Sequence, residues 1–493
     1  MRGRSFPYLR WISIVLIVLA MLLLIIQLVT YSRIRSNFAL GTVIAGVPVG
    51  GLDQQEAAER LTQAYSFPVE IHYGDAVIQI KPSVVGFDLG LETMLAVADQ
   101  QRVNQAFWSA FWDYLWNRLP TPSEVPLRAT FSEERLRAYL KDEIASRYDQ
   151  PAAAAQPVPG STNFSTGAAG LTLDVDRAVT LIGDALRSPD ARVVNLSVVQ
   201  VSPPRPSFQN LQILLQQVID ASNFDGLTEL YLMDLQTGQE LNFAYQNGET
   251  VTPGIAFTAA STMKIPIMVS TFKRTDEPLP SDLADLMTLM IERSENDPAD
   301  RLMEQVMDPN LGPLELTQDM EDLGLPNTFL AGYFYAGAPL LQRFSTPANQ
   351  RTDVYTSPDA YNQTTPAEMG MLLSDIYQCS QTGGGTFAAV FPGKISQNEC
   401  RQMINYLVLD KIGVLLQAGL PEGTQFAHKH GWVTDPTDGV IHTISDAGIV
   451  YSSGGNYILT VYVYHPTQVI WDQANVMVAK LSMAVYNYYN LAP

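Results

Sequence analysis

The C-terminal part of this sequence predicts an α+β fold, an antiparallel sheet of five strands flanked by helices. Strand patterns stand at both ends of residues 208–493, and a largely helical stretch from Ser261 to about Leu407 separates them. Ahead of this part, an apolar run at residues 11–31 predicts one membrane-spanning helix. A weak internal repeat then predicts two small α+β units between the span and the sheet.

The apolar run "WISIVLIVLAMLLLIIQLVTY" contains no charged residue and would span about 30 Å as a helix. Trp11 and Tyr31 stand at its two ends, where interfacial aromatic residues are common. The run exceeds the apolar core of a cleaved signal, and no clear cleavage site follows it. We therefore expect an uncleaved anchor, with residues 1–10 in the cytoplasm and the bulk of the chain outside the cell membrane.

The composition is typical of a folded protein and argues against a nucleic acid partner, whereas the oxidation state of the two cysteines stays open. Hydrophobic residues make up 46% of the 493 residues and charged residues 16%, which is typical of a folded chain. The net charge of −20 would repel phosphate backbones, so we expect no nucleic acid partner. Cys379 and Cys400 are the only cysteines, and they are either a disulfide or two buried thiols.

The N-terminal half contains two related segments, 84–99 and 168–184, each with a glycine, a strand end with leucine and a helix pattern. Before them, "GTVIAGVPVGGLDQQEAAERL" predicts a strand, a glycine turn and a helix capped near Asp53. The proline-rich segment "SPPRPS" can continue neither helix nor sheet, so it marks a boundary. The expected parts are an anchor at 11–31, units at 40–125 and 126–202, a linker at 203–207 and a large domain at 208–493.

Strand patterns in the large domain begin with two strands around the turn "QTGQ". Three more lie around "QFAHKHGWV", "GVIHTISDAGIVY" and "NYILTVYVY", and a helix over roughly 472–488 closes the domain. This order places the helical block between the first two strands and the last three.

The helical block opens with "AASTMKIPI", in which Ser261 precedes Lys264 by three residues. A serine hydroxyl is a weak nucleophile until a neighbouring base takes its proton, and this spacing puts both side chains on one helical face. Lysine is a base only when burial or other cations lower its pKa, and this segment is apolar. Ser270 and Lys273 repeat the spacing deeper in the same helix, where we interpret them as structural.

Two later groups complete an ordered set. "SEN" brings Ser294 and Asn296 to a helix end, and "KHG" places Lys429 beside Gly431 on a strand. Each motif alone is unspecific, but a serine with lysine, a hydroxyl with an amide and a strand lysine in this order point to acyl transfer.

In this ordered set the sequence resembles class A β-lactamases and penicillin-binding serine acyltransferases, which carry Ser-x-x-Lys, Ser-Asp-Asn and Lys-Thr-Gly. The resemblance covers roughly residues 208–493 and implies a β-lactamase/transpeptidase-like fold that acts on a β-lactam or a peptidoglycan stem peptide without cofactor or metal. It implies these roles: Ser261 as acylated nucleophile, Lys264 as proton acceptor, Ser294 as proton shuttle, Asn296 as positioning group, Lys429 as carboxylate holder, His430 and Gly431 as substrate contacts, and the backbone N–H groups of Ser261 and Trp432 as oxyanion hole.

The sequence departs from that family at several positions. Glu295 replaces an aspartate, His430 replaces a threonine, and the segment between Ser261 and Ser294 is shorter than usual. If His430 takes over carboxylate recognition, its titration near pH ~6.5 should strengthen acylation as the pH falls. Residues 331–366 contain no glutamate to activate water for deacylation, and Asp353 and Asp359 are the only carboxylates there. Slow deacylation is therefore expected.

The segment "AGVPVGGLDQQEAAERL" resembles a peptidoglycan-binding module of bacterial wall proteins. It implies that the N-terminal units hold the chain to the cell wall, while a plain spacer stays the alternative. For the whole chain, the alternative to an enzyme is a non-catalytic scaffold with a degenerate domain. His428, His430 and His442 lie close in sequence, but no fourth ligand of clear spacing accompanies them, so we expect no metal.

Overall fold

A computed structural model describes residues 7–118 and 123–491, and the chain divides into two compact units. Unit 1 comprises the residues up to Ala153 together with Ala169–Ser202, and unit 2 comprises Ala154–Ala168 and the residues from Pro203 onward. Residues 1–6 of the expected cytoplasmic segment 1–10 lie outside the described residues. The expected domain boundaries stay a prediction.

The elements of unit 1 are short apart from its first helix. They are α1 (Pro7–Ile34), β1 (Val43–Ile44), β2 (Val47–Pro48), α2 (Gln54–Ser66), β3 (Val69–Tyr73), β4 (Ala76–Ile80), η1 (Pro82–Val85), β5 (Asp88–Leu89), α3 (Leu91–Asn104), α4 (Phe107–Leu115), β6 (Glu124–Val125), β7 (Ala129–Thr130), α5 (Glu133–Tyr139), η2 (Leu140–Ala145), α6 (Ser146–Tyr148), β8 (Gly170–Leu173), α7 (Val175–Leu186), β9 (Val193–Asn195) and β10 (Val198–Val201).

Both halves of the repeat form a strand followed by a helix, β5 with α3 and β8 with α7. The predicted cap at Asp53 is present, because its carboxylate accepts a hydrogen bond from the Glu56 N–H at 2.8 Å and Glu56 returns one to Asp53. The two expected units also share a sheet, since β3 pairs in parallel with β9, Ile71 opposite Val194. Sequence spacing could not indicate this pairing of distant strands.

Helix α1 is long and apolar enough to cross a membrane over Arg10–Ile34, with a mean hydropathy of 3.2. A signal sequence near an N-terminus can be equally long and apolar. Its window of highest hydropathy is not buried against any described part of the chain.

The elements of unit 2 are α8 (Phe208–Ala221), β11 (Leu227–Asp234), β12 (Glu240–Gln246), β13 (Glu249–Val251), β14 (Phe257–Thr258), η3 (Ala260–Met263), α9 (Lys264–Arg274), α10 (Ser281–Glu292), α11 (Asn296–Val306), α12 (Gly312–Asp322), β15 (Phe329–Leu330), β16 (Asn362–Thr364), α13 (Pro366–Thr382), α14 (Thr386–Val390), α15 (Gln397–Leu407), η4 (Gln417–Gly419), β17 (Gln425–Thr434), β18 (Ile441–Tyr451), β19 (Tyr457–Tyr464) and α16 (Trp471–Tyr489).

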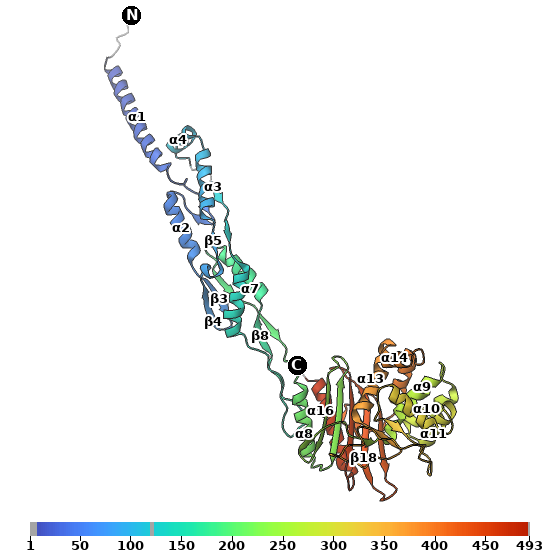
Figure 1. Cartoon of the computed structure of the whole chain (residues 1–493). Helices are drawn as coiled ribbons and strands as arrows, with labels where there is room; N and C mark the ends of the chain where they lie inside the picture. The colour runs from blue at the N-terminus through green and yellow to red at the C-terminus, as the bar shows by residue number, and fades with distance from the viewer. Residues whose placement is uncertain (1–6, 119–122, 492–493) are drawn as a thin grey trace. The chain divides into compact units, whose positions relative to one another are not determined.

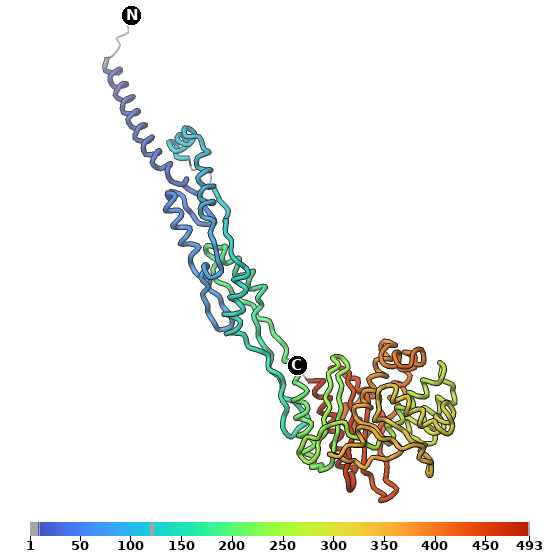
Figure 2. Tube along the Cα trace, in the orientation of Figure 1, coloured from blue at the N-terminus to red at the C-terminus, as the bar shows by residue number. Residues whose placement is uncertain are grey.

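Unit 2 is built on one antiparallel sheet with the strand order β13-β12-β11-β19-β18-β17. The five expected strands are all present, and the short β13 adds a sixth at the edge. Strand β11 pairs with β19, Leu230 opposite Val461, so the first and last strands of the unit lie side by side (Figure 2). This pairing brings the two ends of the domain together around the helical block.

Helices cover both faces of the sheet in unit 2 (Figure 1). On β19 the side chains alternate: Leu459 and Val461 join the core beneath α8 and α16, whereas Ile458 joins the core beneath the helical block. The α+β fold expected from the sequence, an antiparallel sheet flanked by helices, is confirmed. The motifs singled out in the sequence lie where the helical block meets the sheet.

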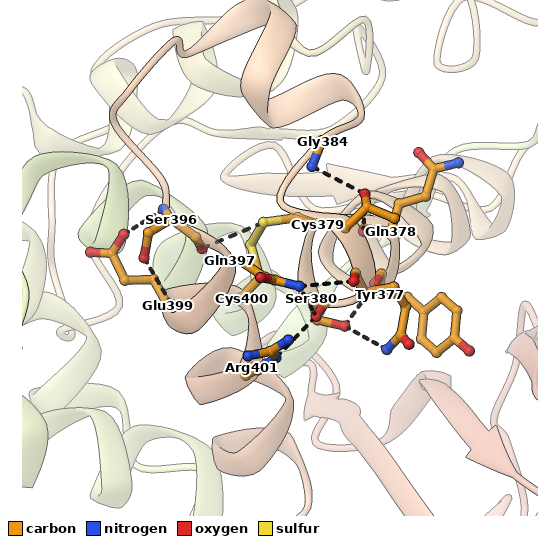
Figure 3. Close-up of a disulfide and its surroundings, with 12 residues drawn as sticks. Tyr377, Gln378, Cys379, Ser380, Gly384, Ser396, Gln397, Glu399, Cys400 and Arg401 are labelled. Atoms are coloured by element: carbon orange, nitrogen blue, oxygen red, sulfur yellow. Dashed lines mark hydrogen bonds between the residues drawn. A yellow bond between two sulfur atoms is a disulfide. The ribbon is translucent and has the colours of Figure 1, made fainter.

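The cysteine question has a definite answer, because Cys379 and Cys400 form a disulfide. It joins α13 to α15, with a Cα–Cα distance of 5.8 Å (Figure 3). Ser396 caps α15 beside it by accepting a hydrogen bond from the Glu399 N–H at 3.1 Å. The bridge therefore fastens two helices of the block to each other.

Candidate active site

Ser261 lies in the 3₁₀ turn η3, directly before α9. The expected α-helix thus begins three residues after Ser261, at Lys264. Two contacts hold the turn: the Ala260 N–H donates to Asn362 Oδ1 at 2.8 Å, and Thr262 Oγ1 lies 2.8 Å from the Tyr462 hydroxyl. Ala260 has a φ of 49°, a left-handed conformation that is uncommon for alanine. The chain is therefore bent sharply just ahead of the serine.

Lys264 supplies a base at the correct distance. Its Nζ lies 2.8 Å from Ser261 Oγ and 2.8 Å from Asn296 Oδ1, and the residue is fully buried. Burial, assisted by the positive charge of Lys429, lowers the pKa of Lys264 to about 7. A large fraction of these amines is consequently neutral near pH 7 and is able to accept a proton.

The "SEN" motif stands between α10 and α11. Asn296 is the first residue of α11, and its amide reaches Lys264. Ser294 adopts a φ of 57° and is half-buried. Among the described residues, its hydroxyl makes no hydrogen bond to Ser261 or Lys264, so the structure connects Asn296 to the pair and leaves Ser294 beside it.

Gly431 permits strand β17 to approach the serine. A Cβ at this position would lie 3.0 Å from the Ser261 nitrogen, 3.0 Å from the Ala259 oxygen and 2.8 Å from Ser445 Oγ. Such contacts are too short for any larger residue without movement of the backbone. The glycine therefore brings the next residue, Trp432, to the same cavity as Ser261.

Lys429 is buried and is paired with Asp410 on the loop after α15. Its Nζ lies 3.0 Å from Asp410 Oδ2, and the same oxygen lies 2.7 Å from His430 Nδ1. Burial lowers the pKa of Lys429, although the charge of Asp410 opposes the change. Burial alone would raise the pKa of Asp410, but His430 and Lys429 outweigh it and hold that pKa below its usual range.

His430 is buried and lies against Asp410. Burial lowers its pKa from the ordinary value, and the hydrogen bond to Asp410 only partly opposes this. Its ring stacks on Trp432 at a centroid distance of 4.6 Å. The strengthening of acylation through a charged His430 stays a prediction, and the lowered pKa would move that effect to a more acidic pH than ~6.5.

His428, on the same strand, is a buried imidazolium. Its Nδ1 lies 2.8 Å from Asp446 Oδ1, and its Nε2 lies 2.9 Å from the Asp410 carbonyl oxygen. Both partners are acceptors, so both ring nitrogens must donate. Burial acts to lower the pKa of His428, yet the Asp446 carboxylate outweighs burial and raises it. The histidine thereby fixes the backbone of Asp410.

A cavity of about 350 Å³ opens in front of Ser261. Of the predicted site residues, Ser261, Asn296 and Trp432 line it. Lys264, Ser294, Lys429, His430 and Gly431 are not among its lining residues. The rest of the wall is mostly aromatic or small and consists of Ala260, Tyr333, Phe334, Tyr335, Gly337, Ala338, Asp359, Tyr361, Asn362 and Val433.

Residues without a motif complete the site. Asp410 binds Lys429, and Asn362 accepts a hydrogen bond from the turn before Ser261. Phe334 lies over Lys264, whose Nζ is 5.2 Å from the ring centroid. Asp300 accepts a hydrogen bond from the Phe334 N–H at 2.8 Å, and burial raises its pKa to about 6. Only their position in the fold reveals them, because each is a common residue type in a loop or helix.

The second serine–lysine pair is structural, as expected. Ser270 is buried inside α9, and Lys273 is bound by the buried Asp319 at 2.5 Å. The end of this helix is therefore ion-paired.

The histidines are engaged elsewhere. His442 groups with Asp435 and Asp438, ligand types that a cation would accept. Its Nε2 lies 2.7 Å from Asp438, and its Nδ1 lies 3.0 Å from the His465 carbonyl oxygen.

Comparison with known protein families gives a match that lies in unit 2. Residues 279–489 match the family described as "Beta-lactamase enzyme family", a range that includes Ser294, Asn296 and Lys429 and begins after Lys264. No curated protein matches the chain.

Several solved structures are similar to unit 2. One is PBP-A, at 22% identity, covering 59% of this chain and 99% of that one, with a TM-score of 0.41. A beta lactamase from Xanthomonas campestris shows 18% identity over 56% and 97%, at 0.41. The beta-lactamase from Streptosporangium roseum shows 19% identity over 56% and 97%, at 0.39. Residues 279–489 of this chain thus match the model of the beta-lactamase enzyme family.

Proposed function

We propose that this chain is a membrane-anchored serine acyl-enzyme that acts outside the cytoplasm on β-lactams or on cell-wall D-alanyl peptides. The observation that carries the proposal is the 2.8 Å contact between Lys264 Nζ and Ser261 Oγ, at a lysine whose pKa is lowered to about 7. A buried neutral amine beside a serine is the arrangement that activates a hydroxyl for attack on a carbonyl.

The reaction would proceed by one bond exchange. Ser261 Oγ attacks the carbonyl carbon while its proton passes to Lys264, and the C–N bond of the β-lactam or peptide then breaks. The leaving nitrogen would then receive that proton, with Ser294 as the expected relay. Backbone N–H groups of Ser261 and Trp432 would hold the oxyanion, and the ammonium of Lys429 would attract the substrate carboxylate.

The rate of acylation should fall as the pH drops through about 7, because an ammonium at Lys264 is unable to accept the serine proton. Below that point we expect a loss of about tenfold per pH unit. Stopped-flow labelling with a chromogenic cephalosporin between about pH 5.5 and 8.5 measures it. A profile that rises toward acid would contradict Lys264 as the base.

Asp410→Asn should destabilise unit 2 by about 3–5 kcal/mol, because it removes one partner of a buried ion pair and leaves Lys429 uncompensated. The charge of Asp410 also acts to raise the pKa of Lys264, so the acid limb of the acylation profile should move to lower pH. Urea unfolding and the pH profile measure the two effects. Asp353→Asn is the matched control, because Asp353 is an exposed partner of Arg351, and it should change neither the stability nor the pH profile. An unchanged pH profile in Asp410→Asn would refute the electrostatic coupling of Asp410 to Lys264.

Slow deacylation belongs to the same proposal. The ring of Phe334 lines the cavity and lies over Lys264. A carboxylate would be needed there to activate a water for deacylation, and a phenyl ring cannot do so. Of the two loop aspartates, Asp353 is exposed and paired with Arg351, whereas Asp359 lines the cavity. The Asp359 carboxylate accepts a hydrogen bond from the Tyr361 N–H at 2.9 Å. Asp359 is therefore the better placed of the two, and its engagement in the loop supports slow hydrolysis.

The wall and membrane assignments rest on unit 1. Helix α1 would anchor the chain, and the units at 40–125 and 126–202 would bind peptidoglycan or act as a spacer. The disulfide in unit 2 supports an oxidising compartment.

A fluorescent penicillin tests the proposal on the full chain. We expect one covalent label that survives denaturing electrophoresis and is blocked by preincubation with unlabelled penicillin. A folded protein that takes up no label yet sediments with purified peptidoglycan would instead establish the non-catalytic scaffold.

A further inference from the structure

Three tryptophans project from one short helix in unit 1. Trp108 and Trp112 lie in α4 and Trp116 directly follows it, with exposed fractions of 62%, 52% and 70%. Their spacing of four residues places them within about 80° of one another around the helix. Aromatic area of this size in contact with water is costly, so the face points to a partner.

The opposite side of α4 packs against the end of α1. Tyr31 of α1 is almost fully buried there, and its ring centroid lies 5.5 Å from that of Phe111 and 5.1 Å from that of Tyr114. The Tyr114 hydroxyl donates to Gln27 Oε1 at 3.0 Å. The last turns of α1 are thus part of the folded unit, and α4 lies beside them (Figure 1).

Two contacts fix the direction of α4. Its first residue, Phe107, lies under the guanidinium of Arg35 at 4.8 Å, whereas Tyr114 near its end reaches Gln27. Helix α4 therefore runs back along α1, toward the apolar run. At 1.5 Å per residue, Gln27 stands about 6 Å inside the end of that run at Tyr31. The Tyr114 hydroxyl stands at this level, and Tyr114 lies between Trp112 and Trp116 in the sequence.

We propose that α4 is an interfacial helix, whose three tryptophans insert into the headgroup region of the lipid leaflet from which α1 emerges. The inference rests on the proposed anchoring by α1. Lipid that covers the apolar surface of α1 up to Tyr31 would also contact the exposed tryptophans of α4, because α4 packs beside Tyr31. Tryptophan favours this interface, and Arg35 stands beyond the end of the apolar run, where phosphate groups would lie.

Brominated lipid tests the depth of these residues in the full chain. We would reconstitute wild type, Trp11→Phe and the triple variant Trp108→Phe/Trp112→Phe/Trp116→Phe in nanodiscs, with phosphatidylcholine that is plain or brominated high on its acyl chains. Bromine quenches only nearby tryptophans, so Trp432 and Trp471 in unit 2 give the unquenched baseline. Trp11 reports the anchor separately from α4.

The proposal expects bromine to remove about half or more of the emission of the Trp11→Phe variant, and much less from the triple variant. Quenching of the triple variant with none in Trp11→Phe would overturn it while leaving the anchor intact. Quenching in neither would overturn the anchor and this inference together. Two chains per disc that become one in the triple variant, without quenching, would assign the face to a second copy instead.

Discussion

Ser261→Ala is expected to abolish covalent labelling by penicillin, a loss of at least about 10⁴-fold in acylation rate. The reason is chemical, because the hydroxyl oxygen at this position forms the ester, and Lys264 lies 2.8 Å from it. The serine lies in a turn on the cavity wall, so removal of one oxygen should leave the fold intact. In-gel fluorescence and thermal unfolding of the same samples measure both expectations.

Ser270→Ala is the control, since it changes the other serine of the repeated spacing. Ser270 is fully buried inside α9 and does not line the cavity. Its variant should label at the wild-type rate. Equal labelling of wild type and Ser261→Ala, or loss of labelling in Ser270→Ala with the fold retained, would reverse the assignment of nucleophile.

Phe334→Glu is expected to turn a slowly released acyl-enzyme into a hydrolase, with a gain of about 10²–10⁴-fold in deacylation. The Phe334 ring lies over Lys264 and lines the cavity with Ser261, so a carboxylate there would reach water near the ester. Release of the adduct, followed by intact-protein mass spectrometry after a chase, measures the rate.

Phe334→Gln separates base catalysis from a change of shape, because the amide has nearly the same size and is not a base. It should retain the slow release of wild type. Deacylation in Phe334→Glu no faster than in Phe334→Gln would disprove the role of this position, and rapid turnover by wild type would refute slow deacylation and turn attention to Asp359.

The sequence was informative where the physics is local. The Asp53 cap and the strand-helix repeats depend on neighbouring residues, and the structure has these elements as expected. The 2.8 Å contact of Ser261 and Lys264 follows from an i, i+3 spacing, although the turn is 3₁₀ at Ser261. In each case adjacent residues determine the geometry.

Other features depend on residues that are distant in sequence. Asp410 meets Lys429 and His430 only because a loop after α15 folds over β17, and no motif marks it. The lowered pKa of His430 follows from burial that the sequence does not display. The parallel pairing of β3 with β9 likewise joins strands separated by more than a hundred residues. Pattern analysis describes segments, whereas these contacts are made by the assembled fold.

Peptide mass spectrometry after incubation of the full chain with benzylpenicillin tests the central claim most directly. The account predicts that the protein gains the mass of one intact penicillin molecule, and that digestion locates the adduct on the peptide containing Ser261. An unmodified protein that is shown to be folded, or an adduct on a different residue, would contradict it.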